Sequence, residues 1–124
     1  MKSALVVHHS RVIRLVAHRI LERLSFAVED AEDGAQALLA CRRAMPDILL
    51  LGHINDMDEA AVVRSLRAAP NGAGTHVILC TIENDTARIT DVMQAGADDF
   101  LFVPFDGAAL KSVFAQPAFA DLAA

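Results

Sequence analysis

The sequence predicts a single α/β domain in which five buried parallel strands alternate with five amphipathic helices. Three observations support this prediction. Short apolar runs recur along the chain, and each is as continuous as a strand buried on both faces requires. Segments with apolar residues at helical spacing separate these runs. The chain has 124 residues, a length that suits one domain and is too short for two. Hydrophobic residues make up 54% of the chain, which suffices for a core.

The first half of the chain contains three predicted strands and two predicted helices. The strands are the apolar runs 5–7, 26–28 and 48–51. Ser10 is a suitable N-cap for the first helix. The inward residues of that helix are Ile13, Val16, Ala17, Ile20, Leu21 and Leu24. Asp33 opens the second helix, which must end before Pro46 because the residue preceding a proline disfavours helical backbone.

The second half repeats the same alternation of helices and strands. A third helix begins at Asp56 or Asp58, and a loop at 70–74 follows it. A strand at 77–80 then leads to a fourth helix, which begins at Asp85 or Thr86 and ends at Gly96. The last elements are a strand at 100–103 closed by Pro104 and a helix capped by Asp106 and ended by Pro117. We therefore expect a domain over 1–116 and a short tail over 117–124.

Composition excludes several classes of protein. No apolar stretch approaches the roughly 20 residues of a membrane span, and the apolar part of the N-terminus is too short for a signal peptide. A net charge of −5 argues against nucleic acid as a partner. Cys41 and Cys80 lie far apart within apolar patterns, as expected of reduced core thiols. We therefore expect a cytoplasmic protein that contacts neither nucleic acid nor membrane.

Parallel strands connected by helices place their carboxyl ends along one edge of the sheet, where ligands bind in such folds. The residues at the ends of the predicted strands or directly after them are His8, His9, Gly52, His53, Thr81 and Val103. Imidazoles can bind Zn²⁺, Ni²⁺ or Cu²⁺, and they titrate near neutral pH. We expect no metal at this edge, with His8, His9 and His53 as the candidate ligands should one bind. A crevice that senses a metal, a small ligand or pH is one alternative function.

Five segments in a fixed order carry a family resemblance, and they lie at 6–14, 31–34, 46–51, 94–100 and 104–106. Together they resemble a response-regulator receiver domain of bacterial two-component signalling, of the single-domain, chemotaxis-regulator type. The similarity extends over residues 3 to 115. The resemblance implies a flavodoxin-like three-layer sandwich with strand order 2-1-3-4-5, and a signalling module that is not an enzyme.

The resemblance also implies a phosphorylation site. In the family, an acidic pair after the first strand binds Mg²⁺, and an aspartate at the end of the third strand accepts the phosphoryl group. A Thr or Ser follows the fourth strand and a Lys follows the fifth. Carboxylate oxygens suit Mg²⁺, and the cations neutralise charge that develops on the phosphoryl oxygens. The corresponding residues here are His8, His9, Gly52, Thr81 and Val103, so only the threonine is retained.

These departures remove the nucleophile, the metal ligands and the charge clamp together. We therefore interpret the chain as a pseudo-receiver that has lost Mg²⁺ binding, needs no cofactor and is not switched by aspartyl phosphorylation. The loop at 52–57 is one residue shorter than is usual in the family. Asp56 in this loop is an alternative acceptor, which would make the chain a phosphorelay receiver with a displaced site. Asp56 lies away from the strand end, and no carboxylate pair remains to bring Mg²⁺ to it.

The resemblance further implies a switch and a partner surface. Thr81 and Phe100 match the family's coupled pair, in which the aromatic ring rotates upon phosphorylation; a ring that simply packs is the other interpretation. Receivers bind partners and dimerise through the face of the fourth helix, fifth strand and fifth helix. In this chain that face includes Arg88, Asp91, Val92, Gln94, Ala95, Phe102 and Lys111. We expect a protein partner, such as a histidine kinase, a response regulator or another signalling protein. A homodimer through this face is an alternative.

Overall fold

Five strands form one parallel sheet in the order β2-β1-β3-β4-β5. The computed structural model describes residues 1–82, 84–103 and 107–114. The strands are β1 (Ser3–Val7), β2 (Ala27–Ala31), β3 (Ile48–Leu51), β4 (His76–Thr81) and β5 (Asp99–Phe102). The crossover from β2 past β1 to β3 creates the point at which the strand order reverses, beside the carboxyl ends of β1 and β3. The order expected from the resemblance is confirmed.

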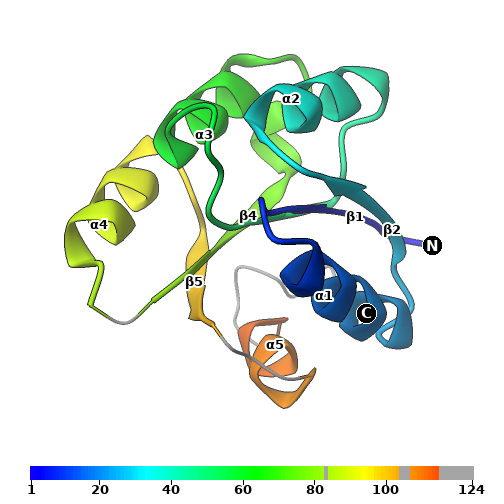
Figure 1. Cartoon of the computed structure of the whole chain (residues 1–124). Helices are drawn as coiled ribbons and strands as arrows, with labels where there is room; N and C mark the ends of the chain where they lie inside the picture. The colour runs from blue at the N-terminus through cyan, green and yellow to red at the C-terminus, as the bar shows by residue number, and fades with distance from the viewer. Residues whose placement is uncertain (83, 104–106, 115–124) are drawn as a thin grey trace.

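Helices cover both faces of the sheet, as expected of a three-layer sandwich. Figure 1 shows α1 and α5 below the sheet and α2, α3 and α4 above it. The helices are α1 (Arg11–Arg23), α2 (Gly34–Arg43), α3 (Glu59–Ala68), α4 (Thr86–Ala95) and α5 (Gly107–Phe114), with a short 3₁₀ turn η1 (Gly72–Gly74) in the loop before β4.

The central strands serve two hydrophobic cores because successive side chains point to opposite faces. In β3, Leu49 and Leu51 pack against the layer of α2, α3 and α4, whereas Ile48 and Leu50 pack against α1 and α5. All four side chains are buried, which explains why this strand is a continuous apolar run in the sequence.

The two cysteines are buried free thiols, one in each core. Burial raises the pKa of both, that of Cys80 to about 12, so each stays protonated and unreactive at neutral pH. Their expected role as reduced core thiols is confirmed.

The helix starts follow the predicted capping residues. Ser10 Oγ accepts the backbone N–H of Ile13, and Asp33 accepts that of Gln36. Asp58, not Asp56, is the N-cap of α3, and it makes no side-chain capping bond.

Several predictions about the elements need correction. The first strand is Ser3–Val7 rather than 5–7, and the fourth is His76–Thr81 rather than 77–80. The second strand is Ala27–Ala31 rather than 26–28, and the fifth is Asp99–Phe102 rather than 100–103. Both are edge strands, and their charged, partly exposed residues break the apolar run that marks the central strands. Val16 was expected to point inward but is 47% exposed, because the buried stripe of α1 runs through Ala17 and Leu21.

Several predictions lie outside the described residues. They concern Pro104, the cap at Asp106, the helix end at Pro117 and the tail over 117–124. Within the described part of the chain, no helix combines the length and the apolar character needed to cross a membrane.

Candidate functional site

The predicted site residues meet at the carboxyl edge of the sheet. Val7 pairs with Leu51 across β1 and β3, and the Gly52 N–H donates to the Val7 carbonyl at 2.7 Å. The His9 N–H donates to the carbonyl of His53 at 2.8 Å, so the two chain segments leave the sheet side by side. The sheet register therefore places the histidines and Gly52 together, as expected.

His8 is buried in this crevice, with 5% of its surface exposed. Its Nδ1 accepts the backbone N–H of Ser10 at 2.9 Å, which leaves the proton of the neutral ring on Nε2. Burial, together with the smaller effect of the charges of neighbouring histidines and arginines, lowers the pKa of His8 from 6.5 to about 4. The imidazole is therefore neutral at physiological pH.

The ring of His8 occupies the space in which a side chain at position 52 would begin. A Cβ added to Gly52 would overlap with Cδ2 of His8 and would lie 3.1 Å from Nε2 of the same ring. Glycine at position 52 and histidine at position 8 are thus sterically complementary. The glycine at position 52 and the buried ring of His8 are therefore two parts of one packing arrangement.

The other two histidines continue a stack that leads out of the crevice. His8 and His9 stack with ring centroids 4.8 Å apart, and His53 meets His9 edge-on at 4.9 Å. His9 Nδ1 lies 3.0 Å from the carbonyl oxygen of His53. His53 itself is exposed. The three rings pack against one another instead of converging their nitrogens on a common point.

This donor set does not fit a metal ion. No group of three or more His, Cys, Asp or Glu side chains in the described ranges is arranged to hold one. Mg²⁺ in particular requires oxygen ligands. Imidazole nitrogens and a glycine stand at the positions where the resemblance expects carboxylates.

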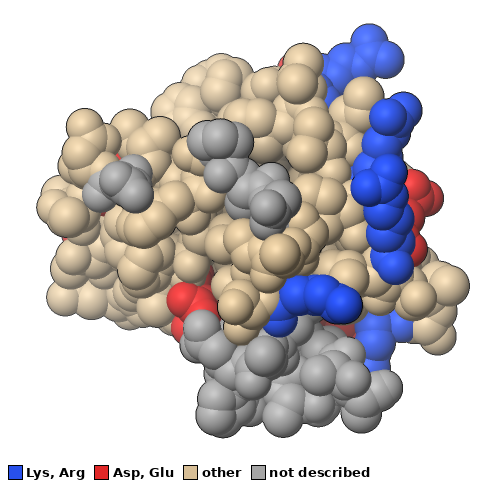
Figure 2. Space-filling model, turned by 90° about the horizontal axis from the view of Figure 1, so that it is seen from below, with Lys and Arg blue, Asp and Glu red and all other residues tan. Residues whose placement is uncertain are grey.

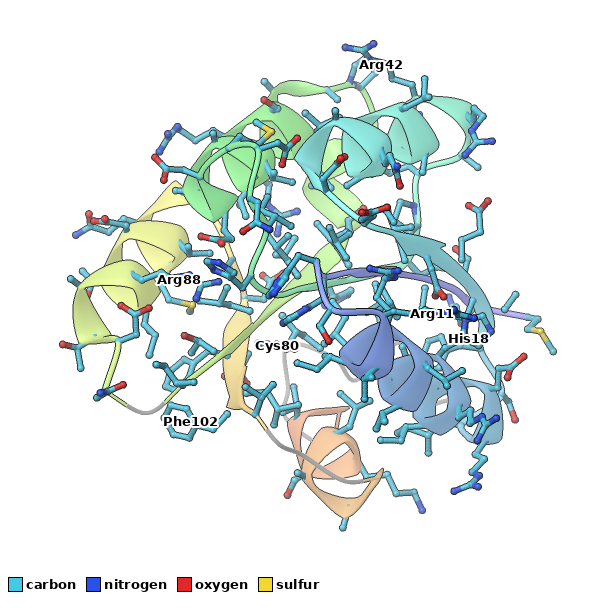
Figure 3. All side chains as sticks on the ribbon, in the orientation of Figure 1. Arg11, His18, Arg42, Cys80, Arg88 and Phe102 are labelled. Carbon is cyan, nitrogen blue, oxygen red and sulfur yellow. The ribbon has the colours of Figure 1, made fainter. Side chains whose placement is uncertain are left out.

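A charged pair that the sequence analysis missed lies beside the histidines. Glu59, the first residue of α3, and Arg88 of α4 are joined by contacts of 3.0 Å from Nε to Oε2 and 2.9 Å from NH2 to Oε1. Their side chains are only 10% and 19% exposed. Arg88, which was predicted to lie on the partner surface, extends from α4 toward the strand ends instead (Figure 3). Its positive charge contributes to the lowered pKa of His8 and partly offsets the rise that burial causes in the pKa of Cys80.

Asp56, the alternative acceptor, has another role. Its carboxylate accepts the backbone N–H groups of Gly34 at 2.9 Å and Ala35 at 3.0 Å. These bonds lower the pKa of Asp56 and join the loop after β3 to the first turn of α2. The carboxylate therefore satisfies free N–H groups of a helix start.

The two residues of the predicted switch differ in burial. Thr81 is buried, and its hydroxyl has no hydrogen-bond partner among residues 1–82, 84–103 and 107–114. Phe100 is 37% exposed and packs against Phe102, with ring centroids 5.5 Å apart. Val103 continues the sheet by donating its N–H to the carbonyl of Thr81 at 2.8 Å.

The predicted partner face is smaller than the sequence suggested. Asp91, Gln94, Phe102 and Lys111 are exposed, and Ala95 is half-buried. Val92 is 1% exposed and belongs to the core beneath α4, so its expected place on this surface is wrong. Its position on the inward side of the helix, one turn after Ile89, accounts for the difference.

A second exposed apolar surface lies on α1. Val12, Leu15 and Val16 are 70%, 48% and 47% exposed, and Arg11 and Arg19 flank them. Figure 2, which views the molecule from below, shows Lys and Arg side chains along one side of this otherwise largely uncharged face. The sequence analysis did not single this surface out, because one of its three apolar residues, Val16, was assigned to the inward stripe of the helix.

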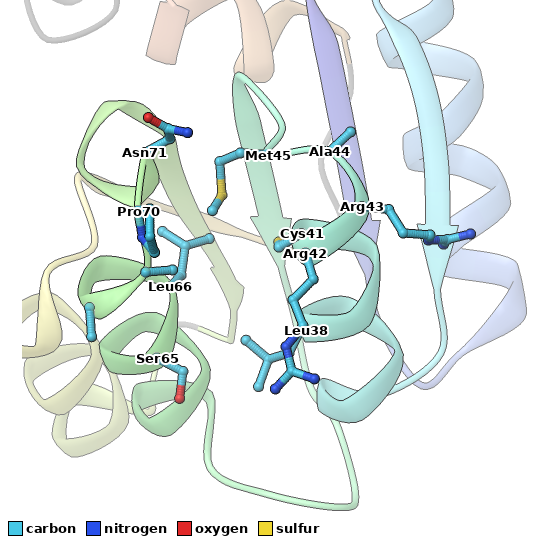
Figure 4. Close-up of a pocket in the computed structure, with 12 residues that line it drawn as sticks. Leu38, Cys41, Arg42, Arg43, Ala44, Met45, Ser65, Leu66, Pro70 and Asn71 are labelled. Atoms are coloured by element: carbon cyan, nitrogen blue, oxygen red, sulfur yellow. The ribbon is translucent and has the colours of Figure 1, made fainter.

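A groove of about 800 Å³ lies between the C-terminal ends of α2 and α3, remote from the strand ends. Leu38, Cys41 and Leu66 line its apolar part, and Arg42 extends beside it (Figure 4). None of the predicted site residues lines this groove.

Comparisons with known proteins agree with the geometry. Residues 4–115 match the family model of the response regulator receiver domain. The chain is 36% identical over 107 residues to the transcriptional regulatory protein CseB of Streptomyces avermitilis, which covers 86% of this chain and 44% of that protein. It is 28% identical over 103 residues to the chemotaxis protein CheY of Bacillus subtilis, covering 82% of this chain and 84% of CheY. The chain thus spans less than half the length of CseB.

Solved structures show the same fold. The chemotaxis response regulator CheY4 of Vibrio cholerae superposes with a TM-score of 0.85 at 24% identity, over 92% of this chain and 96% of CheY4. The receiver domain of the sensor histidine kinase PA1611 from Pseudomonas aeruginosa superposes with a TM-score of 0.82 at 27% identity, over 90% of this chain and 93% of that domain. That structure holds a magnesium ion in its active-site cleft.

Proposed function

The chain belongs to the response regulator receiver domain family, and on that premise we propose that it is a pseudo-receiver, which signals by binding another protein without aspartyl phosphorylation. The single observation that carries this proposal is the packing of His8 against Gly52. An acceptor carboxylate at position 52 would have to begin in space that a buried imidazole fills. The proposal places the protein in the cytoplasm, where two-component receivers meet their partners.

The charges around the crevice support the same proposal. Phosphoryl transfer to a carboxylate needs a cation to offset the charge on the phosphoryl oxygens. The carboxylate of Glu59 is already paired with Arg88, and that of Asp56 is bound by two backbone N–H groups of α2. We therefore propose that Mg²⁺ binding is lost together with the acceptor.

The proposed partner is a signalling protein, such as a histidine kinase or a response regulator. The exposed part of the face of α4, β5 and α5 supports this choice, because it combines the exposed apolar rings of Phe100 and Phe102 with the exposed charges of Asp91 and Lys111. A homodimer through the same face is included in the proposal. No observation in the described residues favours a metal sensor.

Incubation with acetyl phosphate and Mg²⁺, followed by intact-mass measurement, tests the proposal. We expect no phosphoryl adduct, while a receiver domain that retains the acidic pair and the acceptor aspartate is modified in parallel. A stoichiometric adduct would overturn the proposal. Loss of such an adduct in Asp56→Asn, with its retention in Asp58→Asn, would establish the displaced acceptor instead.

A further inference from the structure

The ion pair between Glu59 and Arg88 connects two helices at the carboxyl edge of the sheet. Glu59 is the first residue of α3, and Arg88 lies in the first turn of α4. A hydrogen bond of 3.0 Å from Nε of Arg88 to Oε2 of Glu59 joins the two side chains, and NH2 of Arg88 lies 2.9 Å from Oε1 without making a hydrogen bond. Both side chains are largely buried, so solvent screens the pair only weakly.

Each partner also anchors the chain around it. Oε1 of Glu59 accepts the backbone N–H of Ile54 at 3.3 Å and lies 3.8 Å from Nδ1 of His53. Arg88 NH1 lies 3.6 Å from Oδ2 of Asp85, the N-cap of α4. The pair therefore joins the loop after β3, the start of α3 and the start of α4 through one set of charges.

We propose that Glu59 and Arg88 form an internal latch that holds α4 in one position relative to the loop after β3. The pair supplies, from the chain's own side chains, a carboxylate–cation contact at the edge where a receiver would hold a metal and a phosphoryl group. Both residues are positioning residues, since they act on the partner face only through the placement of α4. The latch deepens the proposed function, because it keeps that face in one arrangement without a phosphoryl signal.

The energetics of buried ion pairs make the latch testable. Removing one partner leaves an uncompensated buried charge, whereas replacing both by apolar side chains of similar size is often tolerated. Arg88→Met should therefore loosen α4, and the double variant Glu59→Met/Arg88→Met should restore the fold without the directional contact. Arg88→Lys keeps the charge but loses the guanidinium and its hydrogen bond through Nε, and it should show an intermediate effect.

Hydrogen exchange read by mass spectrometry locates the effect. We expect amides of α4 and of the loop 53–58 to exchange about tenfold faster or more in Arg88→Met, with Arg88→Lys between this variant and the wild type. Amides of β1 and β2, the two strands farthest from β5 in the sheet, report global stability and should change little. Arg64→Met is the matched control, because Arg64 is an exposed arginine on α3 with no contact to Glu59 among the described residues.

The outcomes separate the latch from a general stabilising contact. Acceleration confined to α4 and the loop supports the latch. Equal acceleration in β1 and β2, or none in α4, overturns it. The test needs no phosphoryl donor, so failure of the latch and failure of the proposed function are read from different measurements.

Discussion

At the scale of single residues, His8 and Gly52 illustrate how one position can determine another. The ring of His8 is held by the Ser10 N–H on one side and by the stack with His9 on another. It cannot swing into solvent without breaking both contacts and exposing a buried group. Glycine is therefore required at position 52 for steric reasons, with no need for an unusual backbone angle there.

We predict that Gly52→Ala destabilises the protein by about 1–3 kcal/mol, the usual cost of forcing an extra methyl group into a packed site. The cost should largely vanish when His8→Ala is already present, giving a coupling energy of about 1 kcal/mol or more. Urea denaturation of the four members of this double-mutant cycle measures both quantities.

Gly74→Ala is the matched control, because a Cβ at Gly74 would meet no atom within 4 Å. Its free energy of unfolding should change by no more than about 0.5 kcal/mol. Additive effects of Gly52→Ala and His8→Ala would contradict the steric coupling.

The residues of the site were predicted unevenly from the sequence. His8, His9, Gly52 and Thr81 were located because a strand end is visible as the end of an apolar run. Glu59 and Arg88 are 29 positions apart, and nothing local relates them. The acidic first turn of α3 offers only a helix-dipole explanation for Glu59, so the pair became visible only through the packing of α3 against α4.

At the scale of elements, Arg67 connects the end of α3 to its neighbours. NH1 donates to the carbonyls of Gly72 and Thr75, both at 2.7 Å, around the turn η1. Nε and NH2 donate to the carbonyl of Gly96, the C-cap of α4, at 3.0 and 2.8 Å. NH2 also pairs with Asp98 just before β5 at 3.0 Å. One guanidinium thus satisfies carbonyls at the ends of several elements.

We predict that Arg67→Lys lowers the free energy of unfolding by about 2 kcal/mol, because a single ammonium group cannot reproduce a planar fork that serves several buried carbonyls. Chemical denaturation measures the change. Arg64→Lys on the exposed side of the same helix should stay within about 0.5 kcal/mol of the wild type. Equal effects of the two substitutions would show that the fork geometry at Arg67 is not what matters.

The elements themselves were predicted best where burial is complete. Ile48–Leu51 was predicted with its observed bounds because both faces of β3 are covered. The predicted bounds of β2 and β5 differ from the observed ones by one to three residues at each end. These are edge strands, and their charged residues interrupt the apolar run that would mark the bounds. The strand order was available only through the family resemblance, because apolar runs do not reveal which strands are neighbours.

At the scale of the whole molecule, stability depends on pH through histidines with opposite environments. Burial lowers the pKa of His8 to about 4, so the native state disfavours its protonation. A hydrogen bond that the Asp30 carboxylate accepts from Nδ1 of His18 raises the pKa of this partly exposed histidine, so the native state favours its protonation. The two residues therefore contribute to the pH profile of the free energy of unfolding with opposite signs.

We predict that His8 makes the protein less stable as the pH falls from about 6.5 to about 4, because the unfolded chain binds a proton there that the native state rejects. The stability that is lost in this way is fully present above pH 6.5. The size of the pKa shift sets the loss at about 3 kcal/mol at most. The contribution of His18 to the free energy of unfolding has the opposite sign. It is present below the unfolded pKa and is lost as the pH rises through the raised native value.

Urea denaturation at several pH values should therefore give a shallower acid limb for His8→Asn, whose amide oxygen still accepts the Ser10 N–H without titrating. His18→Asn is the matched control, since it should lower stability below pH 6.5 and leave the slope due to His8 in place. Parallel profiles for wild type and His8→Asn between pH 6.5 and 4.5 would mean that the ring is solvated and does not fill the space beside Gly52.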